Sequence, residues 1–186
     1  MKLNLGSGYS GNDALFVITQ TQKNDDWIFV DCAEHYRDAA KGCGRFDCYD
    51  FSEGIREPDA SISHVWMGDV LEHVWKWRTR DVLVECFRVL IPGGQLVVSV
   101  PDMERVVRVW LESDGGDDGV ADLIYGQQDA RDRKNCEPDS HKNGFTQGSL
   151  TRLLQSVGFV GIERVRVHGT WYELAVSGRK PGATGG

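Results

Sequence analysis

The sequence lacks any apolar run long enough to cross a membrane, and it lacks a block rich in lysine and arginine. A membrane-spanning helix needs about 18 or more consecutive apolar residues. A nucleic-acid-binding protein normally carries a basic surface, because contacts to phosphates supply much of its affinity. The formal net charge here is -7. We therefore predict that neither a membrane nor a nucleic acid is a partner.

Paired cysteines are also missing, because none of the 5 cysteines forms a C-x-x-C motif. The N-terminus has no apolar segment of the signal-peptide kind, so we expect a cytoplasmic protein with reduced thiols. Ligand-type residues do gather at Cys32, His35, Cys43 and Cys48. Their spacing matches no common zinc finger, and we predict no metal site.

Short apolar runs recur along the chain, each closing on a polar or glycine turn. They lie at residues 2–5, 27–30, 46–49, 62–67 and 95–100. Between the last two, residues 82–90 keep one apolar face at helical spacing and stop at Pro92-Gly93-Gly94. Strand, helix and strand in this rhythm predict a mainly parallel sheet with helices on both faces.

The C-terminal part predicts a helix over residues 150–157, with Ser149 as its N-cap and Gly158 just past its end. Two strands over 161–167 and 171–177 are joined by a tight turn and should be antiparallel. The fold class is thus α/β, Rossmann-like, with a C-terminal antiparallel strand pair. The 186 residues suit one domain, which we place at 1–179, with a disordered tail at 180–186.

A glycine turn, Gly6-Ser7-Gly8, follows the first strand. Glycines allow a sharp turn and a close approach to a ligand, so we expect a side chain at Gly6 to occupy ligand space. Asp31 ends the next strand, where a carboxylate accepts hydrogen bonds from a ribose in dinucleotide folds. Either feature alone fits an ordinary turn, but together they favour a nucleoside site.

Further motifs follow in order along nearly the whole chain. They are LNLGSG at 3–8, FVD at 29–31, CYDF at 48–51, MGDVLEH at 67–73, RVLIPGG at 88–94, YGQ at 125–127, HKNGFT at 141–146 and LLQSVGF at 153–159. This succession resembles the class I methyltransferases that depend on S-adenosylmethionine (SAM), in particular a compact subfamily of the type 11 kind. The resemblance implies a SAM-dependent methyltransferase.

Carried over residue by residue, the resemblance implies a cofactor site at Asn4, Gly6, Ser7, Gly8, Asp31, Cys32, Asp50, Phe51, Met67, Gly68 and Asp69. Asp31 would meet the ribose and Asp50 the adenine amino group. The family usually carries an acidic residue, which organises the methionine end of SAM, where Asn4 stands here. The subfamily that the chain resembles tolerates an asparagine at this position.

Two histidines are candidate catalytic residues. SAM already carries an activated methyl group, so the protein mainly positions the reactants, but a hydroxyl acceptor needs a base. His73 follows the fourth strand, and His141 lies in residues 103–145, which we expect to form a lid and contact the acceptor. Either histidine could instead have only a packing role. Trp75 and Trp77 could line the acceptor pocket or pack inside.

The acceptor is predicted to be a small molecule or a carbohydrate, the latter only by analogy with the subfamily, and a homodimer is left open. One alternative is a SAM- or nucleoside-binding protein without transferase activity. Another is an NAD(P)-dependent oxidoreductase, which the missing third glycine of G-x-G-x-x-G disfavours. A nucleic-acid methyltransferase is disfavoured because no Asn/Asp-Pro-Pro-aromatic motif and no Pro-Cys nucleophile occur.

Overall fold

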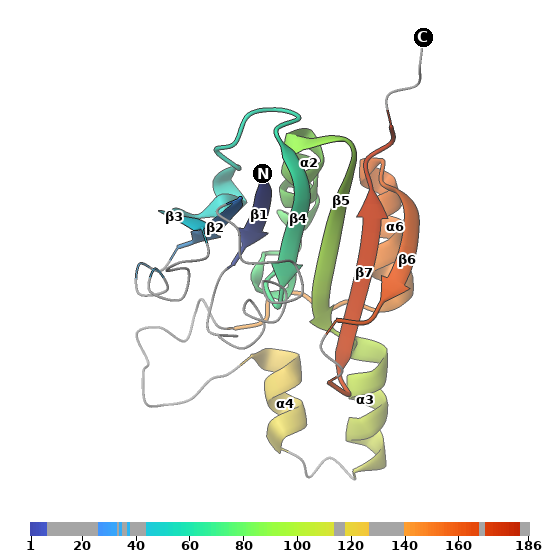
Figure 1. The fold of residues 1–186 in the computed structure, drawn as a ribbon. Coiled ribbons are helices and arrows are strands. Elements are labelled where there is room, and N and C mark those ends of the chain that lie inside the picture. The colour runs from blue at the N-terminus through green and yellow to red at the C-terminus, as the bar shows by residue number, and fades with distance from the viewer. Residues whose placement is uncertain are drawn as a thin grey trace.

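The computed structural model describes residues 1–6, 26–32, 34, 37, 44–113, 118–126, 140–167 and 170–182. Within these residues, seven strands form one sheet in the order β3-β2-β1-β4-β5-β7-β6 (Figure 1). The strands are β1 (Lys2–Leu5), β2 (Trp27–Asp31), β3 (Gly44–Cys48), β4 (Ile62–Gly68), β5 (Leu90–Pro101), β6 (Val160–Val165) and β7 (Glu173–Arg179).

The first five strands pair in parallel with one another, whereas β7 is antiparallel to both β5 and β6. This confirms the predicted Rossmann-like sheet with its C-terminal antiparallel pair. The carboxyl ends of β1, β2 and β4 consequently meet at one edge of the sheet (Figure 1). Ligands of open α/β sheets bind at this edge.

Helices α2 (Thr79–Val89) and α6 (Gln147–Val157) lie together on one face of the sheet, and α3 (Met103–Glu112) and α4 (Asp118–Tyr125) lie beyond the carboxyl edge (Figure 1). Two short 3-10 helices, η2 (Phe51–Glu53) and η3 (Leu71–His73), follow β3 and β4. The expectation of helices on both faces also concerns the connections between β1, β2 and β3, much of which lies outside the described residues. No helix in the described part is long and apolar enough to cross a membrane.

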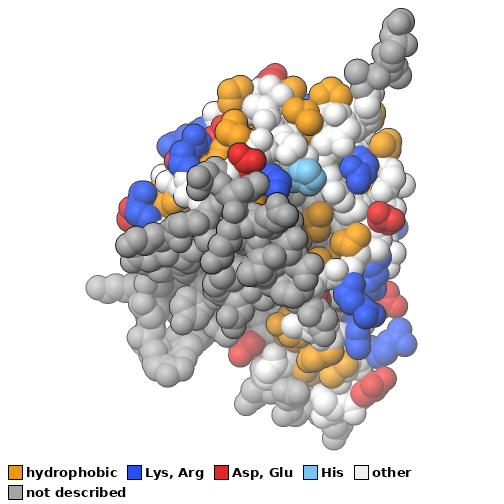
Figure 2. Space-filling model, viewed as in Figure 1, with side chains coloured by type: hydrophobic (Ala, Val, Ile, Leu, Met, Phe, Trp, Pro, Cys, Tyr) orange, Lys and Arg blue, Asp and Glu red, His pale blue; other side chains and the backbone are white. Residues whose placement is uncertain are grey.

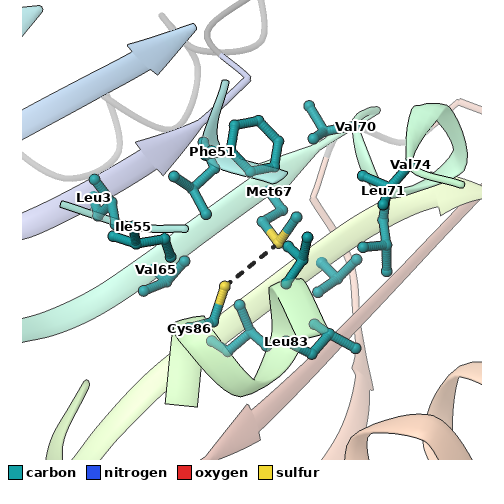
Figure 3. Close-up of a cluster of buried hydrophobic side chains, with 14 of the residues drawn as sticks. Leu3, Phe51, Ile55, Val65, Met67, Val70, Leu71, Val74, Leu83 and Cys86 are labelled. Atoms are coloured by element: carbon teal, nitrogen blue, oxygen red, sulfur yellow. Dashed lines mark hydrogen bonds between the residues drawn. The ribbon is translucent and has the colours of Figure 1, made fainter. Parts of the chain in front are cut away.

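The main core lies between the sheet and the helices α2 and α6. Leu3, Met67, Leu83 and Leu154 are fully buried there, and burying each such side chain contributes about 1.5–3 kcal/mol. Figure 3 shows the Cys86 thiol pointing to the Met67 sulfur, at 3.9 Å. Burial raises the pKa of Cys86 strongly, so this thiol is a packing group.

A second, aromatic cluster consists of Trp27, Phe29, Phe46 and Trp66. Residues of β2 are buried along its whole length, as expected of an inner strand that is covered on both faces. Trp66 is therefore a core residue.

The start of β5 differs from the prediction. Helix α2 ends at Val89, and the strand begins at Leu90, so that the Pro92-Gly93-Gly94 breaker lies inside it. Its pairing with β4 shifts register at this point. Gly93 takes a φ of +79°, and its N–H donates to the Lys180 carbonyl at 3.0 Å. The breaker residues thus form a bulge that is tied to the C-terminal strand.

The N-cap of α6 also differs from the prediction. The cap is Thr146, whose hydroxyl accepts from the Ser149 N–H at 3.3 Å, while the Ser149 hydroxyl accepts from the Thr146 N–H at 2.9 Å. This reciprocal capping box places Ser149 in the first turn, so the assignment of Ser149 as N-cap was wrong. Gly158 ends the helix at a φ of +111°, as predicted.

Candidate active site

The turn after β1 requires a glycine for two reasons. Gly6 has a φ of +71°, and its N–H donates to the Val30 carbonyl at 2.8 Å. A Cβ at Gly6 would lie 2.0 Å from Cγ2 of Val70, the residue before η3. The turn from β1 is thus fitted closely against the segment that follows β4. Ser7 and Gly8, the other predicted members of this turn, lie outside the described residues.

Asn4, on β1, is a buried polar residue with an unusual environment. Its side chain is 3% exposed, and its Oδ1 atom has no hydrogen-bond partner in the part of the chain that the structure describes. A buried acceptor without a donor costs about 1–3 kcal/mol. The amide oxygen therefore suits a donor group of a ligand at this edge of the sheet.

Asp31 and Asp50 come from the ends of β2 and β3. Asp31 is buried, and its carbonyl accepts from the Tyr49 N–H at 2.9 Å. Asp50 is exposed, and its carboxylate accepts from the Ser52 N–H at 2.9 Å at the start of η2. The pKa of the Cys32 thiol is raised, first by partial burial and then by the charges of Asp31 and Asp50. The structure thus brings these three predicted residues together.

The end of β4 carries the next predicted residues. Gly68 lies against the Trp66 indole, which a Cβ there would approach to 2.9 Å. Asp69 has a φ of +50°, and its N–H donates to the Ser99 carbonyl at 2.9 Å. A left-handed conformation in a residue other than glycine is uncommon and recurs at functional sites. The backbone after β4 therefore leaves the sheet sharply, at the edge that holds Gly6.

Two predicted cofactor contacts, Phe51 and Met67, have their side chains in the main core (Figure 3). Met67 is fully buried, and Phe51 is 9% exposed. The Met67 side chain packs in the main core, so only the backbone of this residue could contact a ligand directly.

Both predicted catalytic histidines lie on the carboxyl side of β4. His73 ends η3, and its ring lies edge-on to that of His141, with the ring centroids 4.8 Å apart. The Nδ1 atom of His73 lies 3.3 Å from the Ser140 carbonyl, and that of His141 lies 3.0 Å from the Leu123 carbonyl. Burial lowers the pKa of His141. The structure therefore joins two histidines that are far apart in the sequence.

Glu72, which directly precedes His73 in η3, is a residue that we did not predict. Its side chain is 2% exposed, and its Oε2 atom has no hydrogen-bond partner among the described residues. Burial, together with the negative charge of Asp69, raises the pKa of Glu72 well above its ordinary value. The Leu-Glu-His motif was a signal for this residue, because it contains the acid beside the histidine that we singled out.

The segment that carries His141 is attached to η3 through the backbone. The N–H groups of Lys142 and Asn143 both donate to the Glu72 carbonyl, at 2.8 and 3.0 Å. The Asn143 amide donates to the Thr79 hydroxyl at 3.1 Å. These bonds fix residues 141–143 over η3, so that the two histidines form one unit.

Trp75 and Trp77 extend from this unit into solvent, with exposed fractions of 52% and 71%. The Lys142 ammonium lies over the Trp75 ring, 5.5 Å from its centroid. Neither indole packs inside, which leaves both available to an acceptor. Four residues were considered as zinc ligands from the sequence. The Cys48 thiol donates a hydrogen bond to the Cys32 carbonyl at 3.5 Å, and the other two residues, 35 and 43, lie outside the described residues.

A separate hollow of about 600 Å³ lies where β6 and β7 approach α3. Its lining includes Arg105, Arg164 and Trp171, and Figure 2 shows lysine and arginine side chains gathered over this region. Arg164 donates to the buried Asp102 carboxylate at 3.2 Å. This hollow is basic, in contrast with the acidic edge at Asp31 and Asp50.

Comparisons with known proteins agree with this geometry. A family model described as a methyltransferase domain matches residues 3–98, just over half of the chain. No curated protein sequence matches. Among solved structures, the apo form of the SAM-dependent methyltransferase SibL is similar, with a TM-score of 0.67 and 16% identity over 97% of this chain and 50% of that chain. The present chain therefore spans half the length of SibL.

Two further structures differ in what they hold. A methyltransferase from Haloferax volcanii, described as putative and in complex with the activator Trm112, has a TM-score of 0.66 and 14% identity over 100% of this chain and 83% of that one. A Burkholderia thailandensis N1-methyltransferase with bound 1,6-didemethyltoxoflavin and S-adenosylhomocysteine has a TM-score of 0.60 and 18% identity over 97% and 71%. Identities this low show a shared fold.

Proposed function

Because this chain belongs to the methyltransferase-domain family, whose methyl donor is SAM, we propose that it transfers a methyl group from SAM to a small-molecule acceptor. A carbohydrate is the acceptor class that we favour by analogy. We further propose that the protein is cytoplasmic and that it has no nucleic-acid partner. A homodimer is the oligomeric state that we would test first. A complex with an activator protein is a second assembly to test, because the similar Haloferax methyltransferase is bound to Trm112.

The buried Asn4 oxygen is the observation that carries this proposal. It belongs to β1, two residues before Gly6, and it has no donor within the described residues. The ammonium of an amino acid is a strong donor, and a hydrogen bond to a charged group contributes about 1.5–3 kcal/mol. Asn4 would hold the methionine end of SAM in place of the usual carboxylate, while Gly6 gives the backbone a close approach.

The remaining contacts follow from the strand ends. Asp31 would accept hydrogen bonds from the ribose hydroxyls, and Asp50 would accept one from the adenine amino group. The backbone of Gly68 and Asp69 would border the same ligand from β4. SAM supplies a methyl group that is already activated on a sulfonium, so these residues need only bind and orient it.

The acceptor would approach from the side of η3. His73 and His141 stand there as one unit and would activate the acceptor, with the exposed Trp75 and Trp77 offering flat apolar faces to a ring. The segment 103–145, to which His141 belongs, would complete the acceptor side. The hollow near Arg164 is a second place where an anionic part of an acceptor could bind.

Calorimetry with S-adenosylhomocysteine tests the cofactor site. We expect Asp31→Asn to weaken binding about 10- to 100-fold, which corresponds to the loss of one charged hydrogen bond. Asp59→Asn is the matched control, because Asp59 is an exposed carboxylate that precedes β4 at the opposite edge of the sheet. Equal affinities in parent, variant and control would contradict the site.

Formation of S-adenosylhomocysteine in a screen of small hydroxyl and amine acceptors tests the transfer itself. Acceptor-dependent formation by the parent is expected. Tight binding of S-adenosylhomocysteine without turnover by any acceptor would favour the alternative of a binding protein without transferase activity.

A further inference from the structure

Three side chains of the kinds that bind metal ions converge at η3, where the acceptor is proposed to approach. Glu72 and His73 come from η3, and His141 comes from the segment that is hydrogen-bonded to it. One ligand atom from each residue lies within 4.8 Å of those of the other two. The sequence separates His141 from the pair by almost 70 residues, so no spacing motif reveals this group.

The tautomers of both histidines are set by their partners. A carbonyl oxygen can only accept, so Nδ1 of His73 donates to the Ser140 carbonyl and Nδ1 of His141 donates to the Leu123 carbonyl. Each neutral ring then has its lone pair on Nε2. Metal-ligating histidines typically donate their second ring N–H to a carbonyl or a carboxylate in this way, which fixes the ring and raises its basicity.

Glu72 provides a second, independent indication of a ligand. The residue is only 2% exposed, yet its buried Oε2 atom has no hydrogen-bond partner within the described residues. Buried carboxyl groups in proteins are paired, hydrogen-bonded or bound to metal. A cation between Glu72 and the two imidazoles would satisfy this oxygen.

We propose that Glu72, His73 and His141 bind a divalent first-row transition ion of the zinc type, with one coordination position open towards the acceptor. Two imidazoles and one carboxylate are a ligand set of catalytic zinc sites, which keep a fourth position for water or substrate. Tetrahedral zinc ligands at 2.0–2.2 Å lie about 3.4 Å from one another. Because the present ligand atoms lie within 4.8 Å of one another, side-chain movements of about 1 Å would bring them to this spacing.

The role of the ion rests on the proposed function, although its binding does not. A hydroxyl acceptor at the open position loses its proton more readily, because a cation stabilises the oxyanion. The proton passes to water, and the acceptor oxygen forms a bond to the methyl carbon. The bond between that carbon and the sulfonium breaks, its electron pair stays on sulfur, and a neutral thioether leaves. The histidines thus activate the acceptor through the ion rather than as free bases.

Calorimetric titration of the EDTA-treated protein with Zn²⁺, and absorption spectra with Co²⁺, test the binding. We expect one ion per chain and a cobalt spectrum without a thiolate charge-transfer band, because no cysteine is a ligand. His73→Gln, His141→Gln and Glu72→Gln should each weaken binding by at least about 100-fold, beyond the 10- to 100-fold that outer-shell changes typically cost.

His64→Gln is the matched control, because His64 is an exposed histidine at the amino end of β4 that bonds to Ser63. It should bind Zn²⁺ like the parent. Thermal unfolding of each variant without metal checks that the fold is kept. If one histidine variant fails to fold, the other still tests the site. Unchanged Zn²⁺ affinity in the ligand variants, or a thiolate band that disappears when cysteines are replaced, would overturn the proposed site.

Turnover separates this inference from the proposed function. Metal binding that follows the expected pattern, together with no methyl transfer to any acceptor, would leave the site standing and refute the transferase. Methyl transfer that persists in EDTA, together with no metal binding by the parent, would refute the site and leave the transferase standing.

Discussion

Replacing Gly6 by alanine should destabilise the protein through two separable effects. A φ of +71° costs a residue with a Cβ about 1–2 kcal/mol. The new Cβ would also lie 2.0 Å from Cγ2 of Val70, far inside van der Waals contact, and overpacking of this kind costs about 1–3 kcal/mol. Together we expect a loss of roughly 2–5 kcal/mol in the free energy of unfolding.

Urea unfolding of four variants separates the two effects: Gly6→Ala, Gly93→Ala, Val70→Ala and the double variant of Gly6 and Val70. Gly93→Ala is the control, because Gly93 has a similar φ of +79° and a Cβ there meets no atom within 4 Å. It should lose only the cost of the left-handed conformation. In a Val70→Ala background, Gly6→Ala should cost only a little more than Gly93→Ala, because Cγ2 of residue 70 is gone and only its Cβ, 3.1 Å from the new Cβ, still has to shift.

The binding of S-adenosylhomocysteine to the same variants shows whether the turn also serves the ligand. We expect Gly6→Ala to bind more weakly than Gly93→Ala, even after the Val70 contact is relieved. A Gly6→Ala protein that is as stable as Gly93→Ala and binds as the parent does would refute the reasoning, because it would show that neither Val70 nor a ligand constrains this turn.

Three other predictions concern charge and capping. Asp31→Asn should speed the alkylation of Cys32 by iodoacetamide at pH 8, because the negative charge of Asp31 helps to raise the pKa of the Cys32 thiol. Peptide mass spectrometry measures the rate, and an unchanged rate would place Asp31 away from Cys32. Arg164→Ala should reduce the free energy of unfolding by about 1–3 kcal/mol, because the buried Asp102 carboxylate loses its donor; a smaller loss than with Arg108→Ala, which removes an exposed ion pair, would disprove this. Thr146→Ala should cost about 1 kcal/mol as the cap of α6 is lost, and thermal unfolding that does not change would show that the cap is redundant.

The strands and the sheet topology could be predicted from the sequence because the signals are local. Apolar runs such as residues 27–30 and 62–67 end on polar or glycine residues, and the chain order of strand and helix then determines a parallel sheet. The breaker at Pro92-Gly93-Gly94 misled the prediction of β5, because its glycines are hydrogen-bonded to Lys180, which directly follows the distant strand β7. Local composition cannot indicate that partner.

The proximity of the strand-end residues could be predicted from the sequence, whereas the group around Glu72 could not. Gly6, Asp31 and Asp50 follow strands, so their meeting at one edge is a consequence of the topology. Glu72 was missed, since its significance depends on burial and on His141, which reaches it only through backbone bonds from residues 142 and 143. Contacts of this kind are tertiary and carry no periodic signal in the sequence.

A tertiary contact of this kind also constrains Gly6. From the sequence, a side chain at Gly6 was expected to occupy ligand space. The structure shows that the first atom it would meet belongs to Val70, a residue that no motif connects to the glycine turn. The glycine therefore serves the packing of two segments as well as any approach to a ligand.

A crystal structure of the protein with S-adenosylhomocysteine tests the central claim most directly. We predict that the amino group of the ligand lies within hydrogen-bond distance of the Asn4 oxygen and that the ribose hydroxyls donate to the Asp31 carboxylate. A nucleoside bound anywhere other than the carboxyl edge of β1, β2 and β4, with Asn4 Oδ1 still lacking a donor, would contradict it.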